Sequence, residues 1–168
     1  MLPPHAPPSF SDRSTLWNSV EQTEKSNNSQ LAREIELALP VELSREEQTR
    51  LVREYCSSQF VSKGMCADFN IHDTGSGNPH AHILLTMRPL DEKGAWAAKS
   101  KKEYVLDESG EKILLPSGRY KTRKIDLMDW NRQENADLWR KAWADMANDF
   151  LEQNGSAERI DHRSNAER

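Results

Sequence analysis

The chain has 168 residues, of which 30% are charged and 36% hydrophobic, and its formal net charge is −4. This length fits a single domain over residues 1–168 with a buried core, and no stretch reaches the roughly 18 apolar residues that a membrane-spanning helix needs. The N-terminus lacks the basic start and apolar middle of a signal peptide, so we expect a cytoplasmic protein without a membrane partner. Cys56 and Cys66 lack the spacing of a zinc site and are expected to be reduced packing residues.

Two helices are predicted in the first third of the chain. Residues 1–10 are rich in proline and are expected to form an extended lead-in. A helix over about residues 12–24 follows. The second helix is predicted over about residues 45–59, because Ser44 and Glu47, three positions apart, form a capping box.

A strand is predicted between these helices, over residues 32–39. Its alternation turns Ile35 and Leu37 toward a core and Glu34 and Glu36 toward the opposite face. Two carboxylates on one face can bind a metal directly or hold a ligand histidine in one tautomer. The alternative is an ordinary solvated strand face.

Three of the five histidines fall in one predicted hairpin. Residues 67–72 alternate apolar and polar side chains and end at His72, residues 73–79 are typical of a hairpin loop, and His80 and His82 lie two apart on the next strand. Antiparallel pairing would bring three imidazoles to one sheet face, as a site for divalent manganese, magnesium or zinc. A register shift by one residue would instead send His72 to the other face. The further candidates to face the metal or to orient its ligands are Glu34, Glu36 and Asp68.

A basic segment follows over residues 93–124. It holds nine Lys or Arg against four acidic residues, a local charge of +5 in an acidic chain. Residues 107–111 are typical of a turn between short β-prone runs at 104–106 and 113–115, so the segment is predicted to be a projecting hairpin. Its charge favours a phosphate-tracking surface, and the alternative is a solvated loop. The candidate DNA-binding residues are Lys99, Lys101, Lys102, Arg119, Lys121, Arg123 and Lys124.

The last long element is a helix predicted over about residues 132–153 with Asn131 as its cap, and residues 156–168 are expected to be a flexible tail. The order of the elements predicts an α+β fold. Its sheet should be mainly antiparallel, with helices packed on one face and the metal site on the other. Three imidazoles leave coordination positions open for a substrate oxygen, and the basic segment makes a phosphodiester the natural substrate.

Four motifs resemble the MobA/MobL family of plasmid mobilisation relaxases, which are HUH endonucleases. They lie at residues 39–43 (LPVEL), 78–82 (NPHAH), 139–144 (WRKAWA) and 160–164 (IDHRS). The resemblance implies that His72, His80 and His82 bind a divalent ion. It also implies that a tyrosine nicks one strand at an origin of transfer, forming a 5′-phosphotyrosine, and that the partners are single-stranded or origin DNA and accessory mobilisation proteins.

One departure from the family concerns the nucleophile. The family tyrosine lies ahead of the proline-rich stretch, whereas the tyrosines here are Tyr55, Tyr104 and Tyr120. We therefore expect a chain truncated at its N-terminus, and three hypotheses stay open. The protein is a nickase that uses another tyrosine or a metal-bound water, or it binds metal and single-stranded DNA without the covalent step. The third is a zinc-stabilised regulatory domain with a fourth protein ligand, for which Glu36 and Asp68 are candidates.

Overall fold

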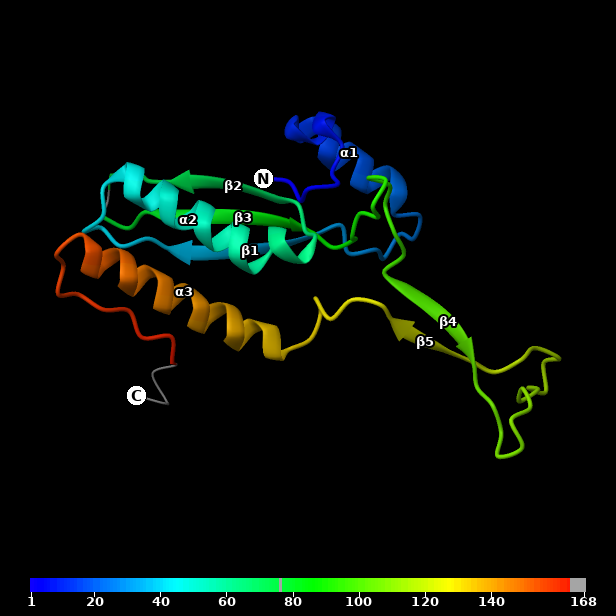
Figure 1. Cartoon of the computed structure of the whole chain (residues 1–168). Coiled ribbons are helices and arrows are strands. Elements are labelled where there is room, and N and C mark those ends of the chain that lie inside the picture. Colours follow the sequence, from blue (N-terminus) through cyan, green and yellow to red (C-terminus); the bar gives the residue numbers. More distant parts are fainter. Residues whose placement is uncertain (76, 164–168) are drawn as a thin grey trace.

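The computed structural model describes residues 1–75 and 77–163 (Figure 1). An antiparallel sheet, two long helices on one side of it, a third helix near one end and a projecting hairpin make up the chain. The α+β class expected from the order of elements is thus confirmed. The elements are η1 (Pro8–Ser11), α1 (Arg13–Thr23), β1 (Ala32–Ala38), α2 (Arg45–Gln59), η2 (Val61–Lys63), β2 (Ala67–His72), β3 (His80–Thr86), β4 (Ser100–Tyr104), β5 (Thr122–Asp126) and α3 (Glu134–Gln153).

The main sheet has the order β1-β3-β2, with β3 antiparallel to both neighbours. Ile83 is paired with Ile35 on one side and with Phe69 on the other, and all three side chains join the main core. Because side chains alternate along a strand, the next residues on each strand point to the opposite face. The expected separation of an apolar and a polar face is therefore present on all three strands.

Helices α2 and α3 cover the apolar face. Leu51 and Tyr55 from α2, together with Trp139 and Trp143 from α3, belong to the same buried cluster as Ile83 of β3. The Tyr55 hydroxyl donates a 2.9 Å hydrogen bond to the carbonyl oxygen of Trp139 and so joins the two helices inside the core. Full burial of a large apolar side chain contributes about 1.5–3 kcal/mol, so this face fixes the register of the sheet.

Helix α1 lies on the other side of the sheet, near the end at which β2 begins. Phe10, Leu16, Val20 and Cys66 form a second, smaller buried cluster there. Cys66 precedes β2 and lies opposite the end of β3, since its N–H bonds the Thr86 hydroxyl. The prediction of helices on one face thus describes α2 and α3, whereas α1 covers one end of the polar face.

Strands β4 and β5 form a two-stranded arm, defined here as residues 100–126, which projects from the body (Figure 1). None of its residues is buried. The expected turn at residues 107–111 is present, because the Asp107 carboxylate accepts from two backbone N–H groups. The predicted β-prone runs are confirmed only in part: Tyr104 ends β4 and the Ile113 N–H bonds the Val105 carbonyl, but beyond Tyr104 these runs form isolated bridges. The regular ladder lies at Ser100–Tyr104 and Thr122–Asp126.

Other boundaries differ in detail. The proline-rich lead-in is not extended to its end, because Pro8–Ser11 forms a 3₁₀ turn, which tolerates proline at its start. Helix α3 begins at Glu134 rather than near residue 132, and Asn131 does not cap it. After α3 the chain folds back, and the Asn148 amide bonds both backbone groups of Ile160. Residues 156–160 are therefore docked rather than free, and residues 164–168 of the expected tail lie outside the described residues.

The first residue occupies the outer edge of β2. The Met1 nitrogen donates to the Ala67 carbonyl at 2.5 Å, and the Ala67 N–H donates to the Met1 carbonyl at 2.9 Å. Such a reciprocal pair is the hydrogen-bonded position of an antiparallel ladder. Among the helices of residues 1–75 and 77–163, none combines the length and the hydrophobicity that a membrane span requires.

Candidate functional site

The three predicted histidines lie on one face of the sheet. His72 is directly paired with His80, and His82 follows two residues later on β3, opposite Asn70. The rings of His72 and His82 are 6.4 Å apart between centroids. The side chains of His80 and His82 retain 27% and 38% of their exposure, so the imidazoles are accessible from solvent.

Two carboxylates from β1 border these histidines. His82 Nδ1 lies 3.0 Å from Glu34 Oε1, and His80 Nε2 lies 3.7 Å from Glu36 Oε1. An ionised carboxylate beside Nδ1 favours the tautomer with the proton on that nitrogen, which leaves Nε2 with a free lone pair. Glu34 is therefore positioned to orient the His82 ring.

Asp68 lies on the same face but has other partners. Its Oδ2 accepts from Arg13 Nε at 2.8 Å and from the Trp17 indole at 3.0 Å, both on α1. Its opposite residue on β3 is Leu84, two positions beyond His82. Asp68 thus links α1 to the sheet at the end of the histidine face that α1 covers. That Asp68 faces or orients a metal stays a prediction.

The donor set suits a divalent ion, but the side chains must rotate to bring the three imidazoles together. Within residues 1–75 and 77–163, no three His, Cys, Asp or Glu side chains form a metal-ligand cluster. Three imidazoles on adjoining strands are nevertheless ligands of the kind that zinc and other divalent ions accept, and the exposure of His80 and His82 leaves room for such a rotation.

The cysteines take no part in this face. Both are free and buried. Burial raises the pKa of the Cys56 thiol to about 12 and that of Cys66 to about 11, so both stay protonated at neutral pH. This agrees with the expectation that they are packing residues.

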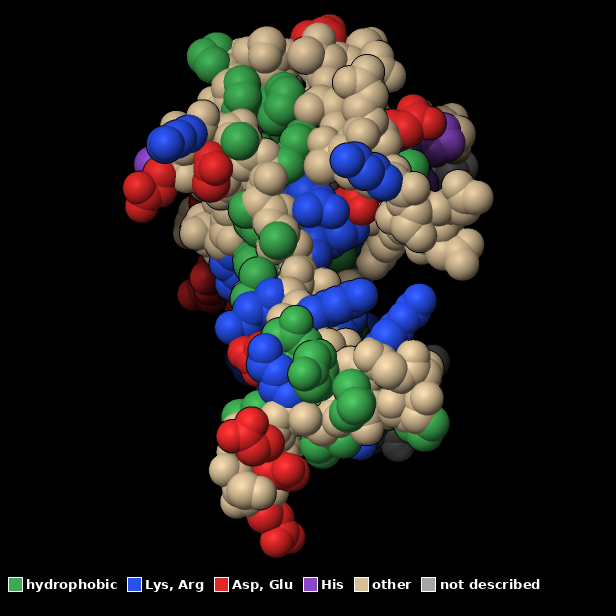
Figure 2. Space-filling model, turned by 90° about the vertical axis from the view of Figure 1, so that its right-hand side faces the viewer, with side chains coloured by type: hydrophobic (Ala, Val, Ile, Leu, Met, Phe, Trp, Pro, Cys, Tyr) green, Lys and Arg blue, Asp and Glu red, His purple; other side chains and the backbone are tan. Residues whose placement is uncertain are grey.

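Basic side chains gather where the arm leaves the body (Figure 2). Arg88 and Lys99 lie on the body side of this junction, and Lys101, Lys102 and Lys124 lie on the first part of the arm. Strands β4 and β5 place Lys102 directly opposite Lys124. Like charges in that position repel each other, so a bound anion would stabilise the pair.

The other candidate cations differ in their pairing. Lys101 and Arg123 both approach Glu103, at 2.9 and 3.4 Å. Lys124 pairs with Asp126 at 2.8 Å. In the described part of the chain, Lys102, Arg119 and Lys121 have no carboxylate partner within ion-pair distance. These three cations are the most available to an external phosphate.

The distal part of the arm has a different character. Residues 104–120 contain three acidic and two basic side chains, and Leu106, Leu114 and Leu115 are exposed there. Lys112 lies over the Tyr104 ring, 3.9 Å from its centroid, with Tyr120 edge-on beside it. The +5 charge of the basic segment is therefore concentrated at the base of the arm rather than at its tip.

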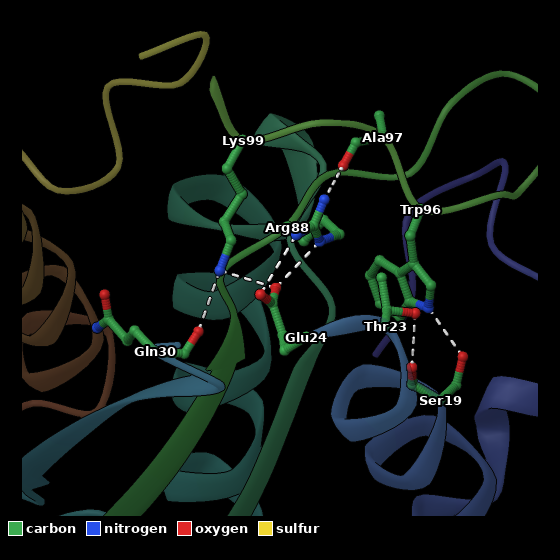
Figure 3. Close-up of polar contacts among 8 residues, drawn as sticks. All are labelled: Ser19, Thr23, Glu24, Gln30, Arg88, Trp96, Ala97 and Lys99. Carbon is green, nitrogen blue, oxygen red and sulfur yellow. Dashed lines mark hydrogen bonds and ion pairs between the residues drawn. The ribbon is translucent and has the colours of Figure 1, made fainter. Parts of the chain in front are cut away.

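A buried carboxylate holds the junction together (Figure 3). Glu24, which ends α1, retains 5% exposure and pairs with Arg88 at 3.0 Å and Lys99 at 2.7 Å. Lys99 also bonds the Gln30 carbonyl. Burial opposes ionisation of Glu24, but the hydrogen bonds and charges of the two cations outweigh it and lower its pKa. Lys99, predicted to bind DNA, thus also has a structural role.

Neither this network nor the covering of the face by α1 was predicted from the sequence. Arg88 lies 64 positions after Glu24, and Lys99 lies 11 positions after Arg88. No local periodicity links the three residues. The one available signal was Glu24 itself, because the helix macrodipole disfavours a negative side chain at a helix C-terminus. An acid at a helix C-terminus suggests a cationic partner.

Comparisons with known proteins agree with these features. A model of the MobA/MobL family matches residues 1–168. A probable mobilization protein MobA of Bifidobacterium longum is 35% identical over 180 residues, covering 98% of this chain and 31% of that protein. The conjugal transfer protein TraA of Agrobacterium fabrum is 38% identical over 150 residues, which cover 89% of this chain and 13% of TraA. The chain thus spans less than a third of these curated relatives.

The fold of the chain is also similar to that of a solved structure. It comes from work on the molecular basis of vancomycin resistance transfer in Staphylococcus aureus. The superposition has a TM-score of 0.78 at 34% sequence identity and covers 98% of this chain and 73% of the other.

Proposed function

Because the chain belongs to the MobA/MobL family, we propose that it carries the metal-binding and strand-binding parts of a DNA relaxase, which nicks one strand at an origin of transfer. The observation that carries this proposal is the open sheet face with His72, His80 and His82. The TraA and MobA relatives, named for conjugal transfer and mobilization, support the DNA substrate. Accessory mobilisation proteins would be the further partners.

The three imidazoles would hold a divalent ion, with manganese, magnesium and zinc as candidates. The ion, when bound, would polarise a non-bridging oxygen of the scissile phosphate. Glu34 would keep the Nε2 lone pair of His82 directed to the ion. Glu36 lies 3.7 Å from Nε2 of His80, so it would favour the proton on that nitrogen and leave Nδ1 of His80 to the ion. The cations at the base of the arm would hold the backbone of the strand through charge.

The positions of the three tyrosines favour the hypothesis that this polypeptide binds metal and single-stranded DNA without the covalent step. Tyr55 is fully buried among the helices and bonds Trp139, and burial raises its pKa. Tyr104 and Tyr120 lie on the arm, which leaves the sheet at the end away from His72 and His80 (Figure 1). We therefore infer that the isolated chain binds metal and single-stranded DNA without forming the covalent intermediate.

Metal binding by calorimetry tests the site. Wild-type protein should bind manganese or zinc, and the double substitution His80→Ala with His82→Ala should abolish that binding. The matched control replaces the two remaining histidines, His5→Ala with His162→Ala, both of which are exposed. Binding that survives loss of His80 and His82 would refute the metal site.

The covalent step has its own assay. The protein is incubated with a labelled origin-type single strand and manganese, and denaturing electrophoresis separates covalent complexes. We expect binding without a covalent band. A band that disappears with Tyr104→Phe or Tyr120→Phe would refute the inference and favour the nickase hypothesis.

A further inference from the structure

A groove lies beside the free edge of β1, where the first turns of α3 run alongside the strand. Its volume is about 440 Å³, within the range of about 300–1,000 Å³ typical of small-molecule sites. One wall comes from residues 33–37 of β1, and the other from residues 131–140 at the start of α3. The side chains of His72, His80 and His82 do not line this groove.

The strand wall offers backbone groups that pair with no other strand of the described residues. The Leu39 N–H bonds the Pro79 carbonyl, so Leu39 is a hydrogen-bonded position of the β1–β3 ladder. Such positions alternate in an antiparallel pair, which makes Leu37 and Ile35 the next two. The backbone N–H and C=O groups of Glu34 and Glu36 therefore point away from β3, at the edge that borders the groove.

The helix wall offers side-chain amides and guanidinium groups. Gln133 and Arg140 are exposed and line the groove seven positions apart, on one side of α3. The side-chain oxygen of Asn131 accepts a 2.6 Å hydrogen bond from Arg33, and its amide N–H groups bond no acceptor among the described residues. Arg132 lines the same wall and has no carboxylate partner in the part of the chain described.

An aromatic side chain with an unused donor also lines the groove. Trp139 is 8% exposed, and its buried indole N–H has no acceptor among the described residues. The Arg33 guanidinium lies 5.4 Å from the Trp139 ring centroid and is pinned by Trp130 and Asn131. A fixed guanidinium plane is a surface on which a nucleobase can stack.

The groove adjoins the histidine face. Glu34 and Glu36 belong to both, since their carboxylates border His82 and His80 while their backbone edges the groove. A strand held at the histidines would therefore extend past this groove. The lining of the groove is mostly apolar, which suits the flat face of a base. The hydrogen-bonding groups on both walls suit the edge of the base, and the two further arginines suit its flanking phosphates.

We propose that this groove binds one unpaired nucleobase of the DNA strand, next to the histidine site. Gln133, with the free backbone of Glu34 and Glu36, contacts the polar edge of the base. Arg132 and Arg140 contact the adjoining phosphates. This inference rests on the proposed function, because it assigns a subsite for the same single strand.

The test compares an ordinary strand with one that lacks bases. Fluorescence anisotropy measures the binding of a thymidine strand of about 12 nucleotides, within the site sizes of single-strand binders, and of an abasic strand with the same backbone. Wild-type protein should bind the ordinary strand about 10-fold more tightly, because stacking and base contacts are lost in the abasic strand. Gln133→Leu with Arg132→Ser should weaken binding of the ordinary strand several-fold and reduce the preference for bases.

Two controls keep the effect specific. Gln153→Leu, at the other end of α3 and equally exposed, should leave both strands unaffected. Arg123→Ala on the arm should weaken both strands by the same factor. Iodouracil placed in the ordinary strand should crosslink to residues 131–140.

The outcomes separate the two proposals. If wild-type protein binds neither strand, the proposed function fails together with the subsite. If it binds DNA, but the groove variant keeps the full preference for bases, the subsite alone is refuted. Crosslinks confined to the arm would refute it as well, and would leave the edge of β1 as a surface for a polypeptide strand.

Discussion

The histidine face and the arm both expose polar side chains, but the two regions hold them differently. On the face, side chains from three strands converge, and a buried core beneath the sheet fixes their register. On the arm, cations are spread along two strands with no buried residue under them. The face can therefore act through a few directed contacts, whereas the arm must act through summed charge. Substitutions in the two regions should differ in size and in salt dependence.

The largest effect is expected from Glu34→Gln on the histidine face. Loss of the carboxylate that orients a ligand histidine typically lowers metal affinity by about 10- to 100-fold. Calorimetric titration with manganese or zinc measures this change. Glu46→Gln on the exposed side of α2 is the control and should have no effect. Unchanged affinity in Glu34→Gln would mean that the 3.0 Å contact with His82 does not orient the ligand.

The next effect concerns the junction between the two regions. Glu24→Gln removes a buried charge from Arg88 and Lys99, and we expect a loss of about 2 kcal/mol in the free energy of unfolding. Urea denaturation measures it, with Glu21→Gln on the exposed side of α1 as the control. If the free energies of unfolding of the two variants differ by less than about 0.5 kcal/mol, the ion pairs of Glu24 with Arg88 and Lys99 make no net contribution to stability.

The same carboxylate should give a pH dependence. Its pKa in the folded protein lies below the usual value of 4.5, so the ionised form favours folding. This contribution is complete above the pKa of the unfolded chain and is lost as the pH falls through the lowered pKa of the folded state. The stability difference between wild type and Glu24→Gln should thus be constant from about pH 6 to 8 and shrink below about pH 4.5. A difference that grows on acidification would contradict this sign.

The smallest effect is expected from Lys102→Ala on the arm. Loss of one phosphate contact should weaken single-strand binding a few-fold and flatten the log–log salt dependence by about 0.7. Anisotropy at several salt concentrations measures the slope, with Lys63→Ala in η2 as the control. An unchanged slope would place the strand elsewhere, and metal binding should be unaffected in either case.

The same contrast explains how much could be predicted from the sequence. The alternation in residues 67–72 and 80–86 is local, and burial of every second side chain enforces it, so the placement of His72, His80 and His82 on one face was accessible. The partners of Asp68 come from α1, more than 50 positions away, and no periodicity reports them. On the arm, apolar side chains have no core to fill, and β-prone runs at 104–106 and 113–115 therefore did not determine the ladder.

The pairing of Met1 with Ala67 has a consequence for the handling of the protein. Because the pair is antiparallel, any residues joined ahead of Met1 in an expression vector would continue along β2 toward His72. A polyhistidine tag attached there would bring competing imidazoles to the very end of the sheet that carries the candidate ligands. Stoichiometry and affinity of metal binding should therefore be measured on protein from which such a tag has been cleaved.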